Sequence, residues 1–193
     1  NHPFPDDYLN NLVDMYANFD AKTSPWTQIV LENAEFELQY AEKLISDCKK
    51  TLEIDKIQDG KLYEKYRGSI LVYEAIISTA FKACRNKDWD ALFRCCLNAD
   101  FGKFAAYRGT YKDEADFIKD EAAKVRKLVK DIPKSMLMST SEISNDCKNL
   151  TGAVRALANA VRHFKSEYEK LKKERNCVEF VDAEYMALGL LTD

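Results

Sequence analysis

Side chains that could carry catalysis are sparse in this 193-residue sequence, which contains 2 His. The triplet Asp100-Phe101-Gly102 matches one motif of protein kinases, but no Gly-rich loop, strand lysine or HRD segment accompanies it. No P-loop or Glu-x-x-His motif occurs, and paired carboxylates such as Asp113 and Glu114 are typical of solvated helix faces. We therefore predict a protein that is not an enzyme and that requires no cofactor or metal ion.

Basic residues occur in two runs with helical spacing. The first run consists of Lys119, Lys124, Arg126, Lys127 and Lys130. The second consists of Lys165, Lys170, Lys172, Lys173 and Arg175, with glutamates between them. The formal charge of the whole chain is −3, so there is no general attraction to polyanions. A solvated helix face is favoured over a phosphate- or heparin-binding surface, and we expect no nucleic-acid partner.

Six cysteines are spread over the chain without a CxxC motif, which argues against a zinc site: Cys48, Cys84, Cys95, Cys96, Cys147 and Cys177. If one helix joins Cys147 to Cys177, a separation of about 45 Å excludes a bridge between them. Helix geometry also excludes Cys48 with Cys84, and the adjacent Cys95 with Cys96. The shortest remaining closure joins Cys84 to Cys95 or Cys96. We predict about three disulfides; the alternative is six buried free thiols.

The start of the sequence and one sequon bear on the compartment. Asn1-His2-Pro3 shows neither an initiator Met nor a basic, apolar leader, as expected after signal-peptide cleavage or in a trimmed chain. The triplet Asn149-Leu150-Thr151 predicts glycosylation at Asn149. The uncharged run from Ala75 to Phe81 is far shorter than the roughly 20 residues of a membrane span. We predict a secreted, extracellular protein; the alternative is an intracellular helical scaffold with reduced thiols.

Apolar residues recur at alternating spacings of three and four, which predicts long amphipathic helices. The pattern is longest from Ile143 to Leu171 and recurs over residues 34–52, 66–84 and 118–132. Shorter helices are predicted over 6–19, 88–97 and 100–107. The fold class is therefore predicted as all-α, a single-domain antiparallel bundle of four long helices plus short helices. Within one domain 1–193, we expect an N-terminal short helix (1–23), a helical hairpin (24–86), short helices with the paired cysteines (87–111), a second helical pair (112–176) and a tail (177–193).

An aromatic cluster follows the paired cysteines, in a segment bounded by glycines. Its members are Phe101, Phe104, Tyr107 and Tyr111, together with Arg108. The cluster is expected to cover one end of the bundle as a small additional core. The alternatives are a pocket for a small apolar ligand or an interface with another protein.

Three features resemble the small secreted, disulfide-containing helical salivary proteins of blood-feeding insects such as mosquitoes. They are the start Asn1-His2-Pro3-Phe4-Pro5, the Cys95-Cys96 pair in an all-helical chain, and the terminal Cys177. The resemblance implies a non-enzymatic effector that acts on a host protein or immune cell, in haemostasis or immune modulation. The alternative is an extracellular carrier of a small apolar or amphipathic ligand. Small residues on the helix seams would leave it room: Ala34, Ala41, Ala80, Ala122, Gly152 and Ala158.

Overall fold

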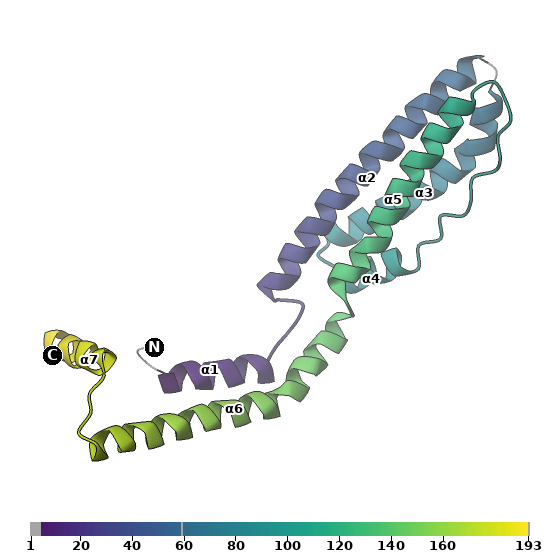
Figure 1. The fold of residues 1–193 in the computed structure, drawn as a ribbon. Helices are drawn as coiled ribbons and strands as arrows, with labels where there is room; N and C mark the ends of the chain where they lie inside the picture. The colour runs from purple at the N-terminus through teal and green to yellow at the C-terminus, as the bar shows by residue number, and fades with distance from the viewer. Residues whose placement is uncertain (1–4, 59, 193) are drawn as a thin grey trace. The chain divides into compact units, whose positions relative to one another are not determined.

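The described part of the chain is all-helical, as predicted (Figure 1). A computed structural model describes residues 5–58 and 60–192, so the expected leader-free start at residues 1–4 lies outside the described residues. Within the described residues there are seven helices and no strand. The helices are α1 (Pro5–Ala17), α2 (Pro25–Gln58), α3 (Lys61–Arg85), α4 (Trp89–Leu97), α5 (Lys112–Met136), α6 (Thr140–Glu174) and α7 (Phe180–Thr192).

The described residues group into two compact units. The central unit spans residues 20–145, and the terminal unit combines the described residues up to 19 with those from 146 onward. The boundary falls inside α6, whose first turn belongs to the central unit. A single domain over 1–193 stays a prediction, and the two units are described separately below.

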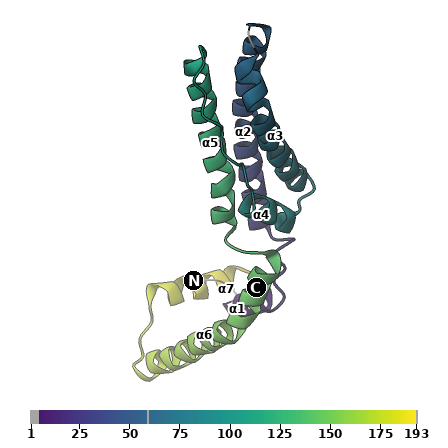
Figure 2. The same cartoon turned by 90° about the vertical axis from the view of Figure 1, so that its right-hand side faces the viewer.

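The central unit is built on α2, α3 and α5, which run side by side in Figures 1 and 2 and pack through their apolar seams. Leu38 and Ile45 on α2, Tyr73 on α3 and Val125 on α5 are all buried. Their spacing of three and four places them on one side of each helix, which brings the three seams into one core. The short helix α4 closes this core with Trp89, whose indole N–H donates to the Met138 carbonyl at 2.9 Å.

The bundle of four long helices stays a prediction, because most of the long helix α6 lies outside the central unit. From Asp146 onward it belongs to the terminal unit, and apolar side chains of its predicted seam are exposed. Leu157 is 63% and Phe164 69% exposed. The alternating pattern showed which side of the helix is apolar, but it holds no information about which element covers that side.

Residues 98–111 form no helix, contrary to the short helix expected over 100–107. The Asp100 carboxylate accepts a hydrogen bond from the Gly102 N–H at 3.0 Å, which makes a local turn. Gly102 then has a φ of +63°, outside the helical range. The segment is instead extended and follows α3 and α5 (Figure 1).

The predicted disulfides are not present, and this correction applies to all six cysteines. Cys48, Cys84, Cys95, Cys96, Cys147 and Cys177 all lie in the described residues, and no two are at disulfide distance. The seam thiols face the backbone of a neighbouring helix rather than another cysteine. Cys48 donates to the Ile118 carbonyl and Cys84 to the Leu31 carbonyl, each at 3.9 Å. Helix geometry correctly places these thiols in the core, but a buried position does not require a disulfide partner.

Burial also makes three of these thiols unreactive. Burial is the main cause that raises the pKa of Cys48 to about 12, with the Glu121 carboxylate adding to it. Burial raises the pKa of Cys84 to about 11 and that of Cys96 to about 12. Because the thiolate is the reactive form, these cysteines behave as small apolar core residues at neutral pH.

Candidate functional site

The aromatic cluster packs mainly against α3. Phe104 meets Tyr66 edge-on with ring centroids 5.0 Å apart, and Phe101 packs on Tyr73 at 4.5 Å. Tyr107 is buried beside Tyr66, and the Tyr66 hydroxyl donates to the Ala105 carbonyl at 3.0 Å. These contacts fasten the extended segment to the helical core.

The other two candidates of the cluster differ in exposure. Tyr111 is half-buried at the start of α5 and packs against the core, whereas Arg108 is exposed. A role for Phe101, Phe104, Tyr107, Arg108 and Tyr111 in a pocket or interface stays a prediction. The burial of Phe101 and Tyr107 means that their rings face the protein itself.

Arg126 on α5 also binds the extended segment 98–111. Its guanidinium donates to the Gly102 carbonyl at 2.5 Å and to the Tyr73 hydroxyl at 3.2 Å. It also lies over the Phe101 ring, 5.9 Å from the centroid. The segment therefore sits between α3 and α5, and the residue that follows Gly102, Lys103, is exposed at this junction.

Positive charge is concentrated on the second half of α5. Residues 122–136 contain five basic residues, among them the exposed Lys127 and Lys130, against the single acidic Asp131. Arg126 and Lys130 are four residues apart and lie on one side of the helix. With Lys103 from the adjoining segment they form a surface that we call the basic face: Lys103, Lys119, Arg126, Lys127 and Lys130.

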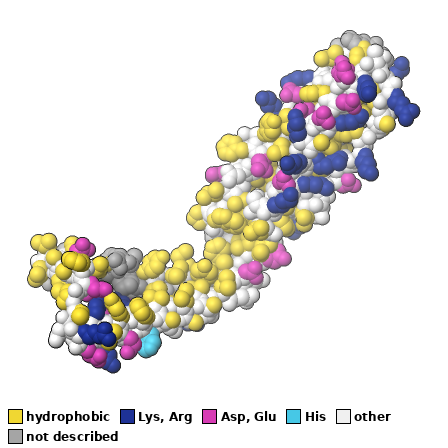
Figure 3. Space-filling view, in the orientation of Figure 1, with side chains coloured by type: hydrophobic (Ala, Val, Ile, Leu, Met, Phe, Trp, Pro, Cys, Tyr) yellow, Lys and Arg dark blue, Asp and Glu magenta, His cyan; other side chains and the backbone are white. Residues whose placement is uncertain are grey.

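Three lysines of the basic face are electrostatically uncompensated. Lys119 is paired with Asp116 at 3.1 Å, whereas Lys103, Lys127 and Lys130 have no ion pair with any described residue. Lys124, the remaining member of the predicted basic run, is held by Glu121 at 2.6 Å. Figure 3 shows dark-blue side chains gathered over this part of the central unit, with acidic groups among them. The sequence run identified four of the five members; Lys103 joins them only through the fold.

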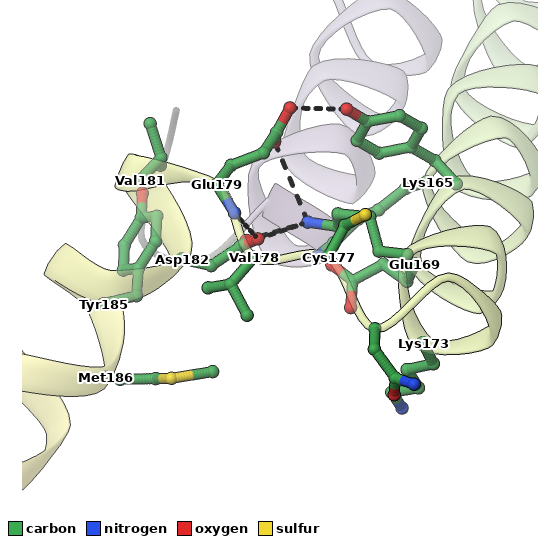
Figure 4. A pocket seen from close by; sticks show the side chains of 13 residues that line it. Lys165, Glu169, Lys173, Cys177, Val178, Glu179, Val181, Asp182, Tyr185 and Met186 are labelled. Carbon is green, nitrogen blue, oxygen red and sulfur yellow. Dashed lines mark hydrogen bonds and ion pairs between the residues drawn. The ribbon is translucent and has the colours of Figure 1, made fainter.

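The second basic run has a different role in the terminal unit. Lys172 bridges both carboxylate oxygens of Asp182 at 2.8 Å and lies 3.9 Å from Glu179, beside a shallow pocket between α6 and α7 (Figure 4). Asp182 also accepts from the Glu179 N–H at 3.0 Å, which caps the start of α7. The Lys172 hydrogen bond is the main cause that lowers the pKa of Asp182. The charged groups of this cluster pair with one another, so its role is to hold α7 against α6.

The remaining candidate groups are isolated. Asn149 is exposed on α6, and its glycosylation stays a prediction. Among the described residues, no three His, Cys, Asp or Glu side chains are grouped so that they could hold a metal ion. Within the same residues, no helix combines the length and apolarity needed to cross a bilayer.

Comparison with known proteins places the chain beside one class of bacterial proteins. No family model matches it, and no solved structure matches it. It is similar to the A-type subunit of the ATP-dependent helicase/nuclease of Clostridium novyi, with 28% identity over 182 residues, covering 93% of this chain and 14% of that protein. The identically named protein from Acetivibrio thermocellus is 25% identical over 199 residues, covering 99% of this chain and 16% of that protein. The protein of the same name from Geobacillus kaustophilus is 28% identical over 198 residues, covering 98% of this chain and 15% of that protein.

The chain thus spans about one seventh of the length of these relatives. The similarity covers nearly all of the chain and therefore includes both units. It overturns the resemblance to insect salivary proteins, because the relatives are bacterial and carry an unrelated name. The resemblance depended on an N-terminal start and on cysteines whose predicted bridges do not form.

Several functional expectations are wrong for the same reason. The relatives are named as helicase/nuclease subunits, not as secreted effectors, which contradicts the extracellular location, the host-protein partner, the immunomodulatory role and the ligand-carrier alternative. Their name denotes an enzyme that acts on nucleic acid, which also contradicts the expectations of no enzyme and no nucleic-acid partner. Of the small residues meant to leave room for a carried ligand, Ala41 and Ala80 are fully buried in the packing between helices, whereas Gly152 is exposed.

Proposed function

We propose that this chain is a helical module within a longer protein of the helicase/nuclease type, and that it binds the phosphate backbone of nucleic acid through the basic face. The observation that carries the proposal is the similarity to bacterial ATP-dependent helicase/nuclease subunits over at least nine tenths of the chain. Because the chain covers about one seventh of those proteins, their ATP-dependent activity as a whole is assigned to the longer polypeptide.

The chemistry of the basic face supports this role. Lys127 and Lys130 are exposed, lie one turn apart on a rigid helix, and have no ion pair with a described residue. Lysine side chains in this state neutralise phosphates and release their counterions, which is the main source of non-specific affinity for nucleic acid. Lys103 adds a third such group from the segment that Arg126 anchors to α5.

The burial of the aromatic cluster limits the mode of binding. Proteins that bind single strands tightly stack bases on exposed aromatic rings. Here Phe101 and Tyr107 are buried against α3, so the basic face offers charge rather than a stacking platform beside it. We therefore expect contacts to phosphates, with little preference for base sequence.

Fluorescence anisotropy with labelled single-stranded and duplex oligonucleotides tests the proposal. The double variant Lys127→Gln/Lys130→Gln is compared with Lys43→Gln/Lys50→Gln, which removes the same charge from exposed positions of α2. The slope of log K against log salt is expected to fall by about 2 in the first variant, with about tenfold weaker binding, and to stay unchanged in the second. Absence of binding by the unaltered chain, or equal losses in both variants, contradicts the proposal.

A further inference from the structure

The helix α7 is apolar on every side from Tyr185 on, and this part is largely uncovered. Phe180 is 93% exposed, Leu190 84% and Leu191 83%. At 100° per residue Tyr185, Met186 and Leu191 point in directions about 100–140° apart, and so lie around the helix axis. From Tyr185 to the end of α7 there is no charged residue. A helix that is apolar all round is typical of the interior of a protein, not of its surface.

The exposed apolar surface continues onto α6 within the same unit. Leu157 and Phe164 are mostly exposed, and Phe164 stacks on Tyr168 with ring centroids 5.7 Å apart. On the far side of α6 from Leu157 and Phe164, Arg162 is joined to α1 through Asp6 at 3.3 Å and Asn10 at 2.6 Å. Contact with α1 therefore leaves this seam of α6 uncovered.

The start of α7 is bound to α6, although the rest of the helix is exposed. Lys172 binds Asp182 in the first turn, and the Tyr168 hydroxyl donates to Glu179 at 2.5 Å (Figure 4). These polar contacts orient α7 relative to α6, while its last two turns present Leu190 and Leu191 outward. The terminal unit thus holds an ordered apolar helix in a position where protein can close around it.

We propose that α7 is a core helix of a larger folded body, enclosed by other parts of the same polypeptide, which also pack on the exposed seam of α6. The inference depends on the longer polypeptide of the proposed function but not on nucleic-acid binding. In relatives that align over at least nine tenths of this chain, about six sevenths of the polypeptide lies outside the aligned part, which is ample to enclose α7.

The observations favour other parts of the same polypeptide over a second copy of the chain or a lipid bilayer. A second copy that packed along the α6 seam would cover one side of α7 and leave the other sides in water. A bilayer is a poor match, because 13 residues of helix extend about 20 Å whereas the hydrocarbon core is about 30 Å thick. The enclosing surface is expected to be apolar and uncharged where it meets Leu190 and Leu191.

Hydrogen exchange on two forms of the protein tests the inference. The 193-residue chain is compared with the complete polypeptide that its gene encodes. We expect the α7 amides to exchange at least 100-fold more slowly in the complete polypeptide, while amides in the middle of α5 exchange at the same rate in both. Equal exchange of α7 in the two forms, or a gene that encodes no further residues, overturns the inference.

A second readout distinguishes intramolecular enclosure from self-association. The 22.2 kDa chain is expected to be monomeric by light scattering, and Leu190→Asp/Leu191→Asp is expected to leave its melting temperature unchanged. The same double variant should lower the melting temperature of the complete polypeptide by several degrees. A dimer of the short chain whose α7 amides are already protected assigns the surface to a second copy instead. Loss of oligonucleotide binding in Lys127→Gln/Lys130→Gln with normal α7 protection separates this inference from the proposed function.

Discussion

Arg126 donates a hydrogen bond to the Gly102 carbonyl at 2.5 Å and thereby joins α5 to the extended segment 98–111. The same guanidinium reaches the Tyr73 hydroxyl on α3, so one side chain links three parts of the central unit. A hydrogen bond from a charged donor contributes about 1.5–3 kcal/mol. Arg126 thus has a structural role that its place in a run of basic residues does not reveal.

The variant Arg126→Lys separates this structural role from charge. Lysine keeps the positive charge but loses the planar fork that reaches two acceptors. We expect the free energy of unfolding to fall by about 1–2 kcal/mol, while oligonucleotide affinity changes little. Urea denaturation and anisotropy measure the two effects. The reverse pattern is expected for Lys127→Gln/Lys130→Gln, and its absence would argue against the division of roles between these residues.

Gly102 and Gly68 form a matched pair for alanine substitution. A Cβ at either position meets no atom within 4 Å, but Gly102 has a φ of +63° whereas Gly68 lies within α3. Gly102→Ala is expected to destabilise the protein by about 1 kcal/mol through backbone strain. Gly68→Ala is expected to stabilise it by about 0.5–1 kcal/mol. Thermal melting measures both, and a shift in the same direction for the two variants contradicts the assigned turn.

We expect the Asp90 carboxylate to make a contribution to stability that depends on pH. It accepts from the Thr140 N–H at 2.9 Å and from the Thr140 hydroxyl at 2.6 Å, at the first residue of α6. Desolvation opposes the charge of this half-buried group, but the Thr140 hydrogen bonds outweigh it and lower the pKa of Asp90.

Because the folded-state pKa is lowered, the stabilisation is fully present above the ordinary Asp value of about 3.9 and is lost as pH falls through the lower folded value. Asp90→Asn should reduce stability at pH 7 and weaken its dependence on pH below 4. Denaturant titrations from pH 7 to pH 2 measure this change. Thr140→Val removes the hydroxyl donor and should weaken the same dependence in part; an unaltered pH profile in both variants would exclude this pair as its source.

We expect the six free cysteines to react with thiol reagents at different rates, according to their burial. All six should titrate in denaturant without prior reduction. In the native protein the exposed Cys177 should react first, because it is open to solvent. Cys48 and Cys96 should react only on unfolding, since burial raises the pKa of each to about 12. Reductant should leave the melting temperature unchanged; a fall of several degrees would restore the disulfide hypothesis.

The sequence by itself determined the helices and the inner sides of most of them. The spacing of Leu38, Ile45 and Cys48 predicts a buried seam on α2, and all three are buried. Such a pattern is local, since 3.6 residues per turn place these side chains on one side whatever packs against them. The position of Cys48 in the core followed from the same rule, but its free thiol did not, and the prediction of disulfides was wrong.

Tertiary structure alone decided which surfaces meet. Phe101, Phe104 and Tyr107 are three residues apart, as on a helix, yet they dock in extended form because Tyr66 and Tyr73 offer ring faces on α3 and Gly102 turns the backbone. Lys103 joins Arg126 at the basic face for the same reason. The apolar seam of α6 was predicted as a buried surface, but Leu157 and Phe164 on it are exposed, and most of α6 belongs to the terminal unit. A local repeat specifies how much apolar surface a helix must bury, whereas the partner that buries it depends on long-range contacts.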